Sequence, residues 1–184
     1  HEYPNPFVTA EVLSALFAAK QCGQTLDSGK VIRGLTALQR NRTRKGAFSY
    51  FAATRPSASV TAAAGRMPAC ELALLRYGKS TQEQLATALR AAFEHHGLLA
   101  AVRKYDDHAD VHGYGGFFFW FDMLGRARAI TALSDGPLRT ELAGRMRKTI
   151  VEELPEIDGC FVDSHELGRT YGTAMALLSL AVLR

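Results

Sequence analysis

The 184-residue sequence has no run of about 18 consecutive apolar residues, the length that a membrane-spanning helix needs. Its three cysteines, Cys22, Cys70 and Cys160, are far apart and odd in number, so no disulfide framework is expected and the cell compartment stays undetermined. Cys70 stands among alanines and leucines and is expected to be a small buried apolar residue. These absences leave a globular chain that is long enough to bury a core of its own.

Strand signals are also missing. β-Branched residues do not gather into runs, no segment alternates between apolar and polar residues, and alanine is abundant, which together favour helices. The net charge of +4 is dispersed, and its densest cluster, Arg40, Arg42, Arg44 and Lys45, falls in an expected loop. Because a nucleic-acid interface needs a contiguous basic face, no nucleic-acid partner is expected.

Periodic apolar residues predict a series of helices, so the chain is expected to be all-α. Asn5 and Pro6 are the residue types of an N-cap and of a first helical turn. The last helix is apolar almost all round, which predicts burial on all of its faces. The main helices are expected over residues 7–20, 28–41, 57–77, 81–96, 117–133, 137–153 and 171–183, with a short one over 98–105.

Two of these helices carry more specific signals. Gly65 and Pro68 predict a kink or a break in the third helix, because proline lacks the N–H that an interior helical position needs. Ser80 or Thr81 followed by Glu83 resembles a capping box, in which side chains bond reciprocally to backbone N–H groups, at the start of the fourth helix.

An internal repeat organises the chain. A Gly-x-Phe or Gly-Phe turn precedes an alanine-rich helix three times, at residues 46–48, 115–118 and 159–161. A more polar helix precedes the first and the third turn. Small-sided helices suit a concave inner ring and amphipathic helices an outer ring, while stacking of successive hairpins buries their apolar faces. A non-repeating helical bundle with glycine at its turns is the alternative.

These turns and helices resemble a known repeat. Residues 158–161 and 171–180, Asp-Gly-Cys-Phe and Tyr-Gly-Thr-Ala-Met-Ala-Leu-Leu-Ser-Leu, resemble the prenyltransferase and squalene-oxidase repeat. That repeat has a Gln/Asp-Gly-aromatic turn before an inner helix of the form Thr-Ala-x-Ala-Leu-x-x-Leu. Residues 35–48 resemble a second copy with a basic insertion, and residues 115–133 resemble a divergent third, with Arg-Ala where Thr-Ala is usual.

The resemblance implies the fold of terpene cyclases and protein prenyltransferases. We therefore expect residues 1–184 to form a single domain, a partial α/α toroid of helical hairpins with alanine-rich inner helices and amphipathic outer helices. Because fewer helices are expected here than a complete double ring holds, the chain resembles a C-terminal portion of a larger ring, with a missing N-terminal part.

A candidate catalytic motif lies at residues 106–110, Asp-Asp-His-Ala-Asp. The Asp-x-Asp-Asp acid motif of class II terpene cyclases is absent from the sequence. Asp106, Asp107 and Asp110 instead match the Asp-Asp-x-x-Asp pattern with which other isoprenoid enzymes hold Mg²⁺ and ionise a diphosphate. That pattern belongs to a different helical fold, and a solvated loop or a helix cap is the alternative.

A candidate metal site is implied by the same family. Protein prenyltransferases bind Zn²⁺ through an aspartate, a cysteine two residues later and a histidine from a later repeat, and Asp158 and Cys160 resemble the first two. His165 is the nearby substitute for the histidine, and Glu166 could close the site. The alternative is an ordinary turn in which Cys160 packs inward.

An aromatic run suggests a ligand site. Residues 117–121 are all aromatic, which is too continuous for one helix face, so some of them should line a cavity or a partner surface. Tyr114, Phe118 and Trp120 are therefore candidates for contact with an apolar small molecule or another protein domain.

Polar residues in two loops are further candidates. If the loops of successive repeats converge, His112, Asp163, His165 and Glu166 share one mouth of the central cavity. The alternative is that the acid at 163 and Ser164 cap a helix terminus, since both are good N-cap residues.

Two functions follow from these observations. The first is a repeat domain that serves as a binding or assembly module without an assigned activity. The second is an isoprenoid-processing enzyme of the cyclase or prenyltransferase type, with an apolar central cavity and with Zn²⁺ or Mg²⁺ as the candidate metal. Fold resemblance does not decide between them, because function depends on the site.

Overall fold

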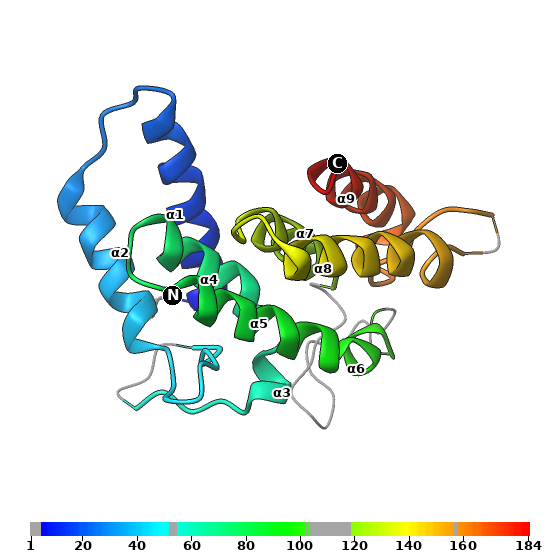
Figure 1. The fold of residues 1–184 in the computed structure, drawn as a ribbon, viewed down its shortest axis with the longest axis horizontal. Helices are drawn as coiled ribbons and strands as arrows, with labels where there is room; N and C mark the ends of the chain where they lie inside the picture. The colour runs from blue at the N-terminus through cyan, green and yellow to red at the C-terminus, as the bar shows by residue number, and fades with distance from the viewer. Residues whose placement is uncertain (1–4, 52–54, 102, 104–118, 157) are drawn as a thin grey trace. The chain divides into compact units, whose positions relative to one another are not determined.

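The computed structural model describes residues 5–51, 55–101, 103, 119–156 and 158–184 (Figure 1). Over these residues the chain is all-α, as predicted, with no strand and with one isolated bridge between Arg42 and Phe48. No helix in the described part is long and apolar enough to cross a membrane. The helices divide into two compact units, residues 1–91 and 92–184, each with its own core.

The first unit begins with two capped helices, α1 (Pro6–Gln21) and α2 (Ser28–Arg40). The side chain of Asn5 accepts a hydrogen bond from the N–H of Phe7 at 2.9 Å and closes the start of α1, as the sequence predicted. Asp27 does the same for α2, accepting from the N–H of Lys30 at 3.0 Å. Each cap satisfies a backbone donor that the first helical turn cannot.

The predicted break in the third helix is present. It divides the segment into α3 (Val60–Ala63) and α4 (Met67–Arg76), with Gly65 between them and Pro68 in the first turn of α4. Proline is tolerated there because the N–H groups of a first turn have no intrahelical partner.

The capping box of α5 (Gln82–Glu94) differs in one residue from the prediction. Thr81 Oγ1 accepts from the N–H of Gln84 at 3.2 Å, and Gln84 Oε1 accepts from the N–H of Thr81 at 3.0 Å. The prediction of Glu83 as the partner was therefore wrong by one position. With Thr81 as the N-cap, the third helical residue is Gln84, and only that side chain can reach back to the cap.

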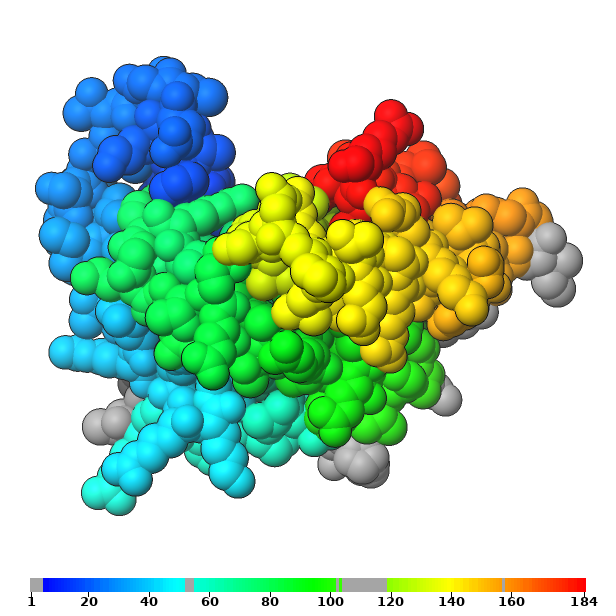
Figure 2. Space-filling model, in the orientation of Figure 1, coloured from blue at the N-terminus to red at the C-terminus, as the bar shows by residue number. Residues whose placement is uncertain are grey.

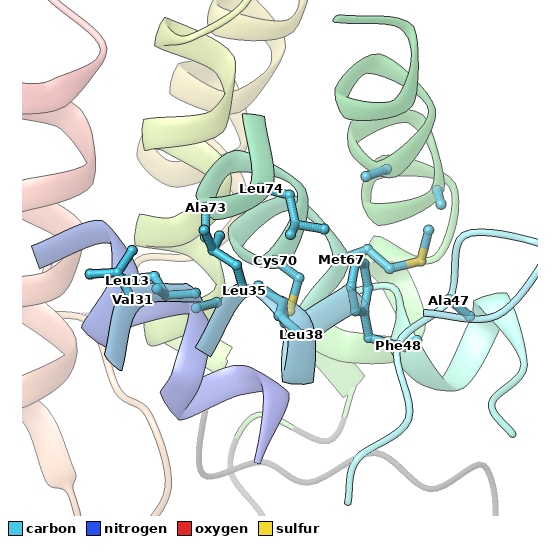
Figure 3. Packing of buried hydrophobic residues seen from close by; sticks show 14 residues of the cluster. Leu13, Val31, Leu35, Leu38, Ala47, Phe48, Met67, Cys70, Ala73 and Leu74 are labelled. Carbon is cyan, nitrogen blue, oxygen red and sulfur yellow. The ribbon is translucent and has the colours of Figure 1, made fainter. Parts of the chain in front are cut away.

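The core of the first unit lies where α1 packs against α2 and α4 (Figure 3). Leu13, Leu38 and Leu74 come from these three helices and are almost fully buried, and Cys70 is fully buried, as predicted. Burial of each large apolar side chain contributes about 1.5–3 kcal/mol. The absence of a side chain on Gly34 lets α2 approach α1 closely, since a Cβ there would lie 3.2 Å from Leu13 Cδ2.

A tight turn follows α2. Gly46 has φ of 82°, the N–H of Thr43 donates to Ala47 O at 2.8 Å, and the N–H of Gly46 donates to Thr43 O at 3.0 Å. Phe48 comes next and is fully buried. Arg66 then fixes the turn to the following helices, because its Nε and Nη2 donate to Phe48 O at 2.9 and 2.6 Å.

The second unit contains the end of α5 and the helices that follow it. Helix α7 packs against both α8 and α9 (Figure 1). A π-helical segment extends α8 to residue 153, which was the predicted end of that helix. The bounds are α6 (His96–Ala101), α7 (Phe119–Thr131), α8 (Pro137–Lys148), the π-helix (Thr149–Glu153) and α9 (Gly168–Val182).

A second tight turn precedes α9. Gly159 has φ of 76°, the N–H of Glu156 donates to Cys160 O at 2.8 Å, and the N–H of Gly159 donates to Glu156 O at 2.8 Å. Phe161 comes next and is buried. Thr173 of α9 fixes this turn, because its Oγ1 accepts from the N–H of Phe161 at 3.1 Å.

The prediction that the last helix is buried on all faces was wrong. In α9 the side chains of Leu177 and Leu178 are 58% and 51% exposed, whereas Ala176 and Ser179 are fully buried. Among the described elements of its unit, α9 packs mainly against α7, which covers one side of the helix. Apolar residues on every face allow a helix to be buried. They do not ensure that another element packs against each face.

Candidate functional site

Several predicted site residues lie outside the part of the chain that the structure describes, together with the predicted turn at 115–118. They include all three residues of the predicted diphosphate-ionising motif and three of the predicted ligand contacts. The residues are Asp106, Asp107, Asp110, His112, Tyr114 and Phe118. Their roles remain predictions.

The structure brings together two of the predicted ligand residues, Trp120 and Asp163. Both side chains are fully buried. Asp163 Oδ2 accepts from the N–H of Trp120 at 3.0 Å, and Asp163 Oδ1 accepts from the N–H of Ser164 at 2.9 Å. Trp120 is the second residue of α7, and the N–H groups of a first helical turn need partners from outside the helix. Asp163 therefore caps α7 from a loop 43 residues further along the chain.

This arrangement agrees with the cap alternative for the loop before α9. In that alternative Asp163 and Ser164 cap a helix terminus that the sequence does not specify, and in the structure the carboxylate of Asp163 caps α7. Ser164 serves the following helix, because its Oγ accepts from the N–H of Leu167 at 3.3 Å, directly before α9. The indole of Trp120 forms a second hydrogen bond between α7 and this loop, donating from Nε1 to Val162 O at 2.9 Å.

Burial controls the protonation of Asp163. It raises the pKa of this carboxyl to about 7, against the lowering influence of the two N–H donors and of the Arg103 guanidinium. Burial, together with the charges of Asp163 and Asp122, raises the pKa of the Tyr171 phenol to about 12. The site therefore contains a carboxyl that is partly protonated at neutral pH and a phenol that is fully protonated.

Two buried arginines complete the polar interior of this unit. Arg103 donates from Nη1 to Leu154 O at 3.0 Å and from Nη2 to Glu156 Oε1 at 3.3 Å. Arg126 is 1% exposed, and its Nη1 lies 3.2 Å from His96 Nδ1. Burial lowers the pKa of Arg126 to about 10, and burial beside these cations lowers the pKa of His96 to about 4. His96 is therefore neutral, and its Nδ1 accepts from Arg126.

Aromatic rings cover these guanidinium groups. The guanidinium of Arg126 lies 5.1 Å from the ring centroid of Phe93, and that of Arg103 lies 5.7 Å from the ring centroid of Phe119. Such contacts favour a cation in a place with little water. Phe119 and Trp120 therefore line a charged interior of the unit, which sequence analysis did not predict.

The other predicted ligand residues, His165 and Glu166, are exposed. The structure therefore does not place them in the buried environment of Asp163. Although both follow it closely in sequence, the turn before α9 directs them to the surface, where a charged side chain keeps its hydration.

The predicted zinc ligands do not converge. No group of three or more histidine, cysteine, aspartate or glutamate residues that could hold a metal ion occurs among the described residues, which include Asp158, Cys160 and His165. Asp158 instead forms an ion pair with Arg169 and accepts from the N–H of Cys160 at 3.3 Å. A hydrogen bond to Asp158 is the main cause that raises the pKa of the Cys160 thiol, which opposes the thiolate form that Zn²⁺ requires.

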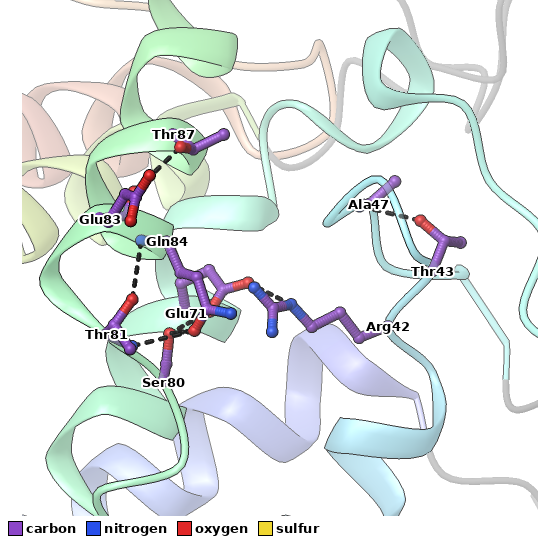
Figure 4. A network of polar contacts seen from close by, with 9 residues as sticks. All are labelled: Arg42, Thr43, Ala47, Glu71, Ser80, Thr81, Glu83, Gln84 and Thr87. Atoms are coloured by element: carbon purple, nitrogen blue, oxygen red, sulfur yellow. Dashed lines mark hydrogen bonds and ion pairs between the residues drawn. The ribbon is translucent and has the colours of Figure 1, made fainter.

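A polar network that sequence analysis missed lies in the first unit (Figure 4). Glu71 of α4 is 1% exposed. Its Oε1 lies 2.7 Å from Arg42 Nε, and its Oε2 accepts from Ser80 Oγ at 2.5 Å. Burial raises the pKa of Glu71, and the bond from Ser80 and the charge of Arg42 oppose this shift. One signal was available, since Glu71 is the single acid within the apolar stretch 67–75.

Described residues of the first unit also line hollows at its surface. One of about 350 Å³ adjoins this network and is lined by charged residues that include Arg44, Lys45 and Glu83. Another, of about 420 Å³, has a mostly apolar lining that includes Val31 and Leu35.

Exposed apolar side chains form one stripe on α9, which we call the α9 stripe. Its members are spaced at i, i+3, i+4 and i+7, so they share one face of the helix. They are Ala174, Leu177, Leu178 and Ala181, and all four are exposed. Figure 2 shows the C-terminal residues, in red, at the surface of the molecule. An exposed apolar face of this kind is typical of an interaction surface.

The described residues thus form an all-α protein with two buried charge networks and with exposed apolar side chains along one face of α9. Comparison with models of protein families, with curated proteins and with solved structures found no match to this chain.

Proposed function

We propose that this chain is a repeat domain of the prenyltransferase and squalene-oxidase kind, a partial α/α toroid, and that it serves as a binding or assembly module. In this proposal both units derive from one ancestral unit with three principal helices. Helices α1, α2 and α4 correspond to α7, α8 and α9. The first helix of each set packs against the other two, which supports the correspondence.

A constant spacing supports the duplication. Helix α1 begins at residue 6 and α7 is described from 119, α2 ends at 40 and the π-helix after α8 ends at 153, and the turn glycines are at 46 and 159. All three differences are 113 residues (119 − 6, 153 − 40 and 159 − 46). The two turns also use the same pair of backbone hydrogen bonds. The second helices begin 109 residues apart (137 − 28), so the constant spacing applies to the turn and to the helix end before it.

Burial follows the same spacing. Each of the five buried residues of α1 has a buried counterpart in α7 at that distance. The residues of α1 are Pro6, Phe7, Ala10, Leu13 and Ser14, and their counterparts are Phe119, Trp120, Met123, Arg126 and Ala127. The match runs in one direction, because four other buried residues of α7 have counterparts in α1 that are not buried, and none of the five pairs is identical.

The third helices align at a shorter distance. Residues 65–66 and 168–169 are both Gly-Arg, and residues 73–75 and 176–178 are both Ala-Leu-Leu, each pair 103 residues apart (168 − 65 and 176 − 73). The loop between turn and helix is therefore ten residues longer in the first unit (113 − 103). Length changes of this kind are tolerated in surface loops, whereas the helix and the turn keep their contacts.

The two copies differ in the burial of one helix face, and this difference is the main support for the proposed binding role. Leu74 of α4 is fully buried and belongs to the core cluster that includes Ala88 and Ala91 of α5. Its counterpart on α9, Leu177, is 58% exposed. The same helix face is thus buried in the core of the first unit and open in the second, which supports a binding partner on α9.

Surface substitutions test this proposal. In the double variant Leu177→Glu/Leu178→Glu, at a concentration at which the chain is monomeric, the free energy of unfolding should change by no more than about 0.5 kcal/mol. Binding of a hydrophobic dye should fall. Leu74→Glu at the matching buried position should prevent folding of the first unit. A loss of several kcal/mol in the double variant would show that the face is already covered and would refute the proposal.

The alternative function, an isoprenoid-processing enzyme, has one observation in its favour. Asp163 is a buried carboxyl beside Trp120 and holds a proton at near-neutral pH, as a general acid must. Both of its oxygens, however, are engaged by backbone N–H groups, which suits a cap. Mass analysis of a lipid extract and metal analysis of the purified chain distinguish the two, because a bound isoprenoid or stoichiometric Zn²⁺ would favour the enzyme.

A further inference from the structure

The residues of the α9 stripe form a palindromic pattern along the helix. From Ala174 to Ala181 the pattern is Ala-x-x-Leu-Leu-x-x-Ala, with its centre between Leu177 and Leu178. When two such helices pack antiparallel about a two-fold axis through that centre, each leucine meets the other leucine of the second copy, and each terminal alanine meets the opposite alanine. A two-fold interface brings the same surface patch of both chains together, and here it would match leucine with leucine and alanine with alanine.

We propose that the α9 stripe docks against the same stripe of a second copy of this chain, in an antiparallel pair. This inference rests on the proposed assembly function and names the partner. The leucines fill the centre of the contact, and the small side chains of Ala174 and Ala181 let the helix axes approach at its ends.

Charge does not oppose the pairing. Helix α9 has no charged residue between Arg169 and Arg184, so the two stripes bring no like charges together along their length. Arg169 is already paired with Asp158 at the edge of the helix. A helix face in water usually carries charges on its exposed side, and their absence over four turns fits a face that is covered by a partner.

The size of the stripe sets the expected strength of the contact. Two turns of helix, about 10 Å long, bury much less than the roughly 1,200 Å² that a stable interface needs. The dimer should therefore be reversible, with a dissociation constant in the micromolar range or weaker.

Sedimentation velocity over a range of protein concentrations tests the association. The wild-type chain should shift reversibly from monomer to dimer, and Leu177→Glu/Leu178→Glu should remain monomeric while its circular dichroism stays unchanged. Ile32→Glu is the matched control, because Ile32 of α2 is 61% exposed and lies outside the stripe. This variant should dimerise like the wild type. Dimerisation of the double variant would overturn the proposal.

Cysteine cross-linking tests the register. In a Cys22→Ser/Cys160→Ser background, a mixture of Ala174→Cys and Ala181→Cys chains should form mixed disulfide dimers under mild oxidation. Ala174→Cys alone should not, because its two cysteines would lie about 10 Å apart along the pair. Cross-linking of Ala174→Cys alone would indicate a parallel pair and would overturn the proposal.

The same variants separate this inference from the proposed function. Suppose that the wild-type chain stays monomeric while the double variant folds normally and binds less dye. These results together would mean that a different protein binds the stripe. The self-association would then be wrong and the binding module would stand. A double variant that loses several kcal/mol would overturn both.

Discussion

The backbone N–H of Trp120 donates to Asp163 Oδ2 at 3.0 Å, so a loop residue closes the N-terminus of α7. The contact joins the turn before α9 to the helix against which α9 packs. Because the cap is also a buried titratable group, the stability of the second unit should depend on the protonation of one side chain. Trp120 is the only tryptophan of the chain, so tryptophan fluorescence reports on the contact between Trp120 and Asp163.

The first prediction concerns the pH dependence that Asp163 causes. The pKa of this carboxyl is about 7 in the folded chain and near 3.8 when unfolded, so between these values the folded chain binds more protons. Its contribution to stability is therefore complete below pH 3.8 and is lost as the pH rises through 7. Relative to Asp163→Asn, the wild-type chain should lose up to about 1.4 kcal/mol per pH unit over this window.

Urea unfolding followed by Trp120 fluorescence from pH 4.5 to 8 measures this difference. The comparison uses the change with pH and not the absolute stability, because asparagine can accept only one of the two N–H bonds that Asp163 accepts. A difference between the two proteins that stays constant with pH would contradict the raised pKa.

The second prediction concerns His96 and has the opposite sign. Burial beside Arg126 lowers the pKa of His96 from 6.5 to about 4, so between these values the unfolded chain binds more protons. Its contribution is present above pH 6.5 and is lost as the pH falls toward 4. Relative to His96→Gln, the wild-type chain should lose stability on acidification, by up to about 1.4 kcal/mol per pH unit.

An NMR titration of the His96 ring gives an independent measurement. The ring should stay neutral at pH 5.5, and titration near the ordinary value would contradict the buried contact with Arg126. The opposing effects of His96 and Asp163 overlap from pH 4 to 6.5, so a flat wild-type profile is compatible with both. Only the single variants separate them.

The third prediction concerns the contact of α9 with the turn before it. A Cβ on Gly172 would lie 2.5 Å from Phe161 O and 3.0 Å from Asp163 N. Both are backbone atoms, which cannot rotate away as a flexible side chain can. Gly172→Ala should therefore force α9 away from the turn and cost about 3 kcal/mol in the free energy of unfolding.

Gly144 provides the matched control. It lies within α8, and a Cβ there would meet nothing within 4 Å. Gly144→Ala should stabilise the chain by about 0.5–1 kcal/mol, because alanine loses less conformational freedom in a helix. Chemical denaturation of both variants measures the contrast, and equal effects of the two substitutions would show that the close approach at Gly172 is absent.

Local features of the fold could be predicted from the sequence. The cap by Asn5, the break near Gly65 and Pro68 and the end of the α8 segment at residue 153 agree with the prediction. Each depends on residues within one helical turn, whose propensities and hydrogen bonds act before any tertiary contact forms. The error at the start of α5, Glu83 in place of Gln84, was one position within such a turn.

The buried site could not be predicted in the same way. Asp163 was recognised as a cap residue, but its partner is Trp120, 43 residues earlier in the chain. Glu71 looked like one polar residue in an apolar helix, and its partner Arg42 is 29 residues away (71 − 42). The open face of α9 likewise depends on which neighbours the fold supplies. Such features require the tertiary structure, because local sequence does not specify distant partners.

The last prediction concerns the ion pair between Arg42 and Glu71. Glu71 is almost completely buried, so Arg42→Met leaves its carboxylate in the core with Ser80 as the remaining partner shown in Figure 4. At pH 7 this should cost about 3 kcal/mol, near the low end for removal of one partner from a buried pair, because Arg42 is partly exposed. Loss of the cation also raises the pKa of Glu71 further, so the cost should shrink as the pH falls and the carboxyl takes up a proton.

A double-mutant cycle tests the coupling of the pair, with unfolding followed by circular dichroism. Glu71→Gln should destabilise the wild-type chain but stabilise the Arg42→Met variant, because it removes the buried charge that the first substitution left unpaired. Lys30→Met is the control, since the ion pair of Lys30 with Asp27 is exposed and should be worth no more than about 1 kcal/mol. Additive effects of the substitutions at Arg42 and Glu71 would mean that the pair, despite its 2.7 Å separation, does not hold α4 to the turn after α2.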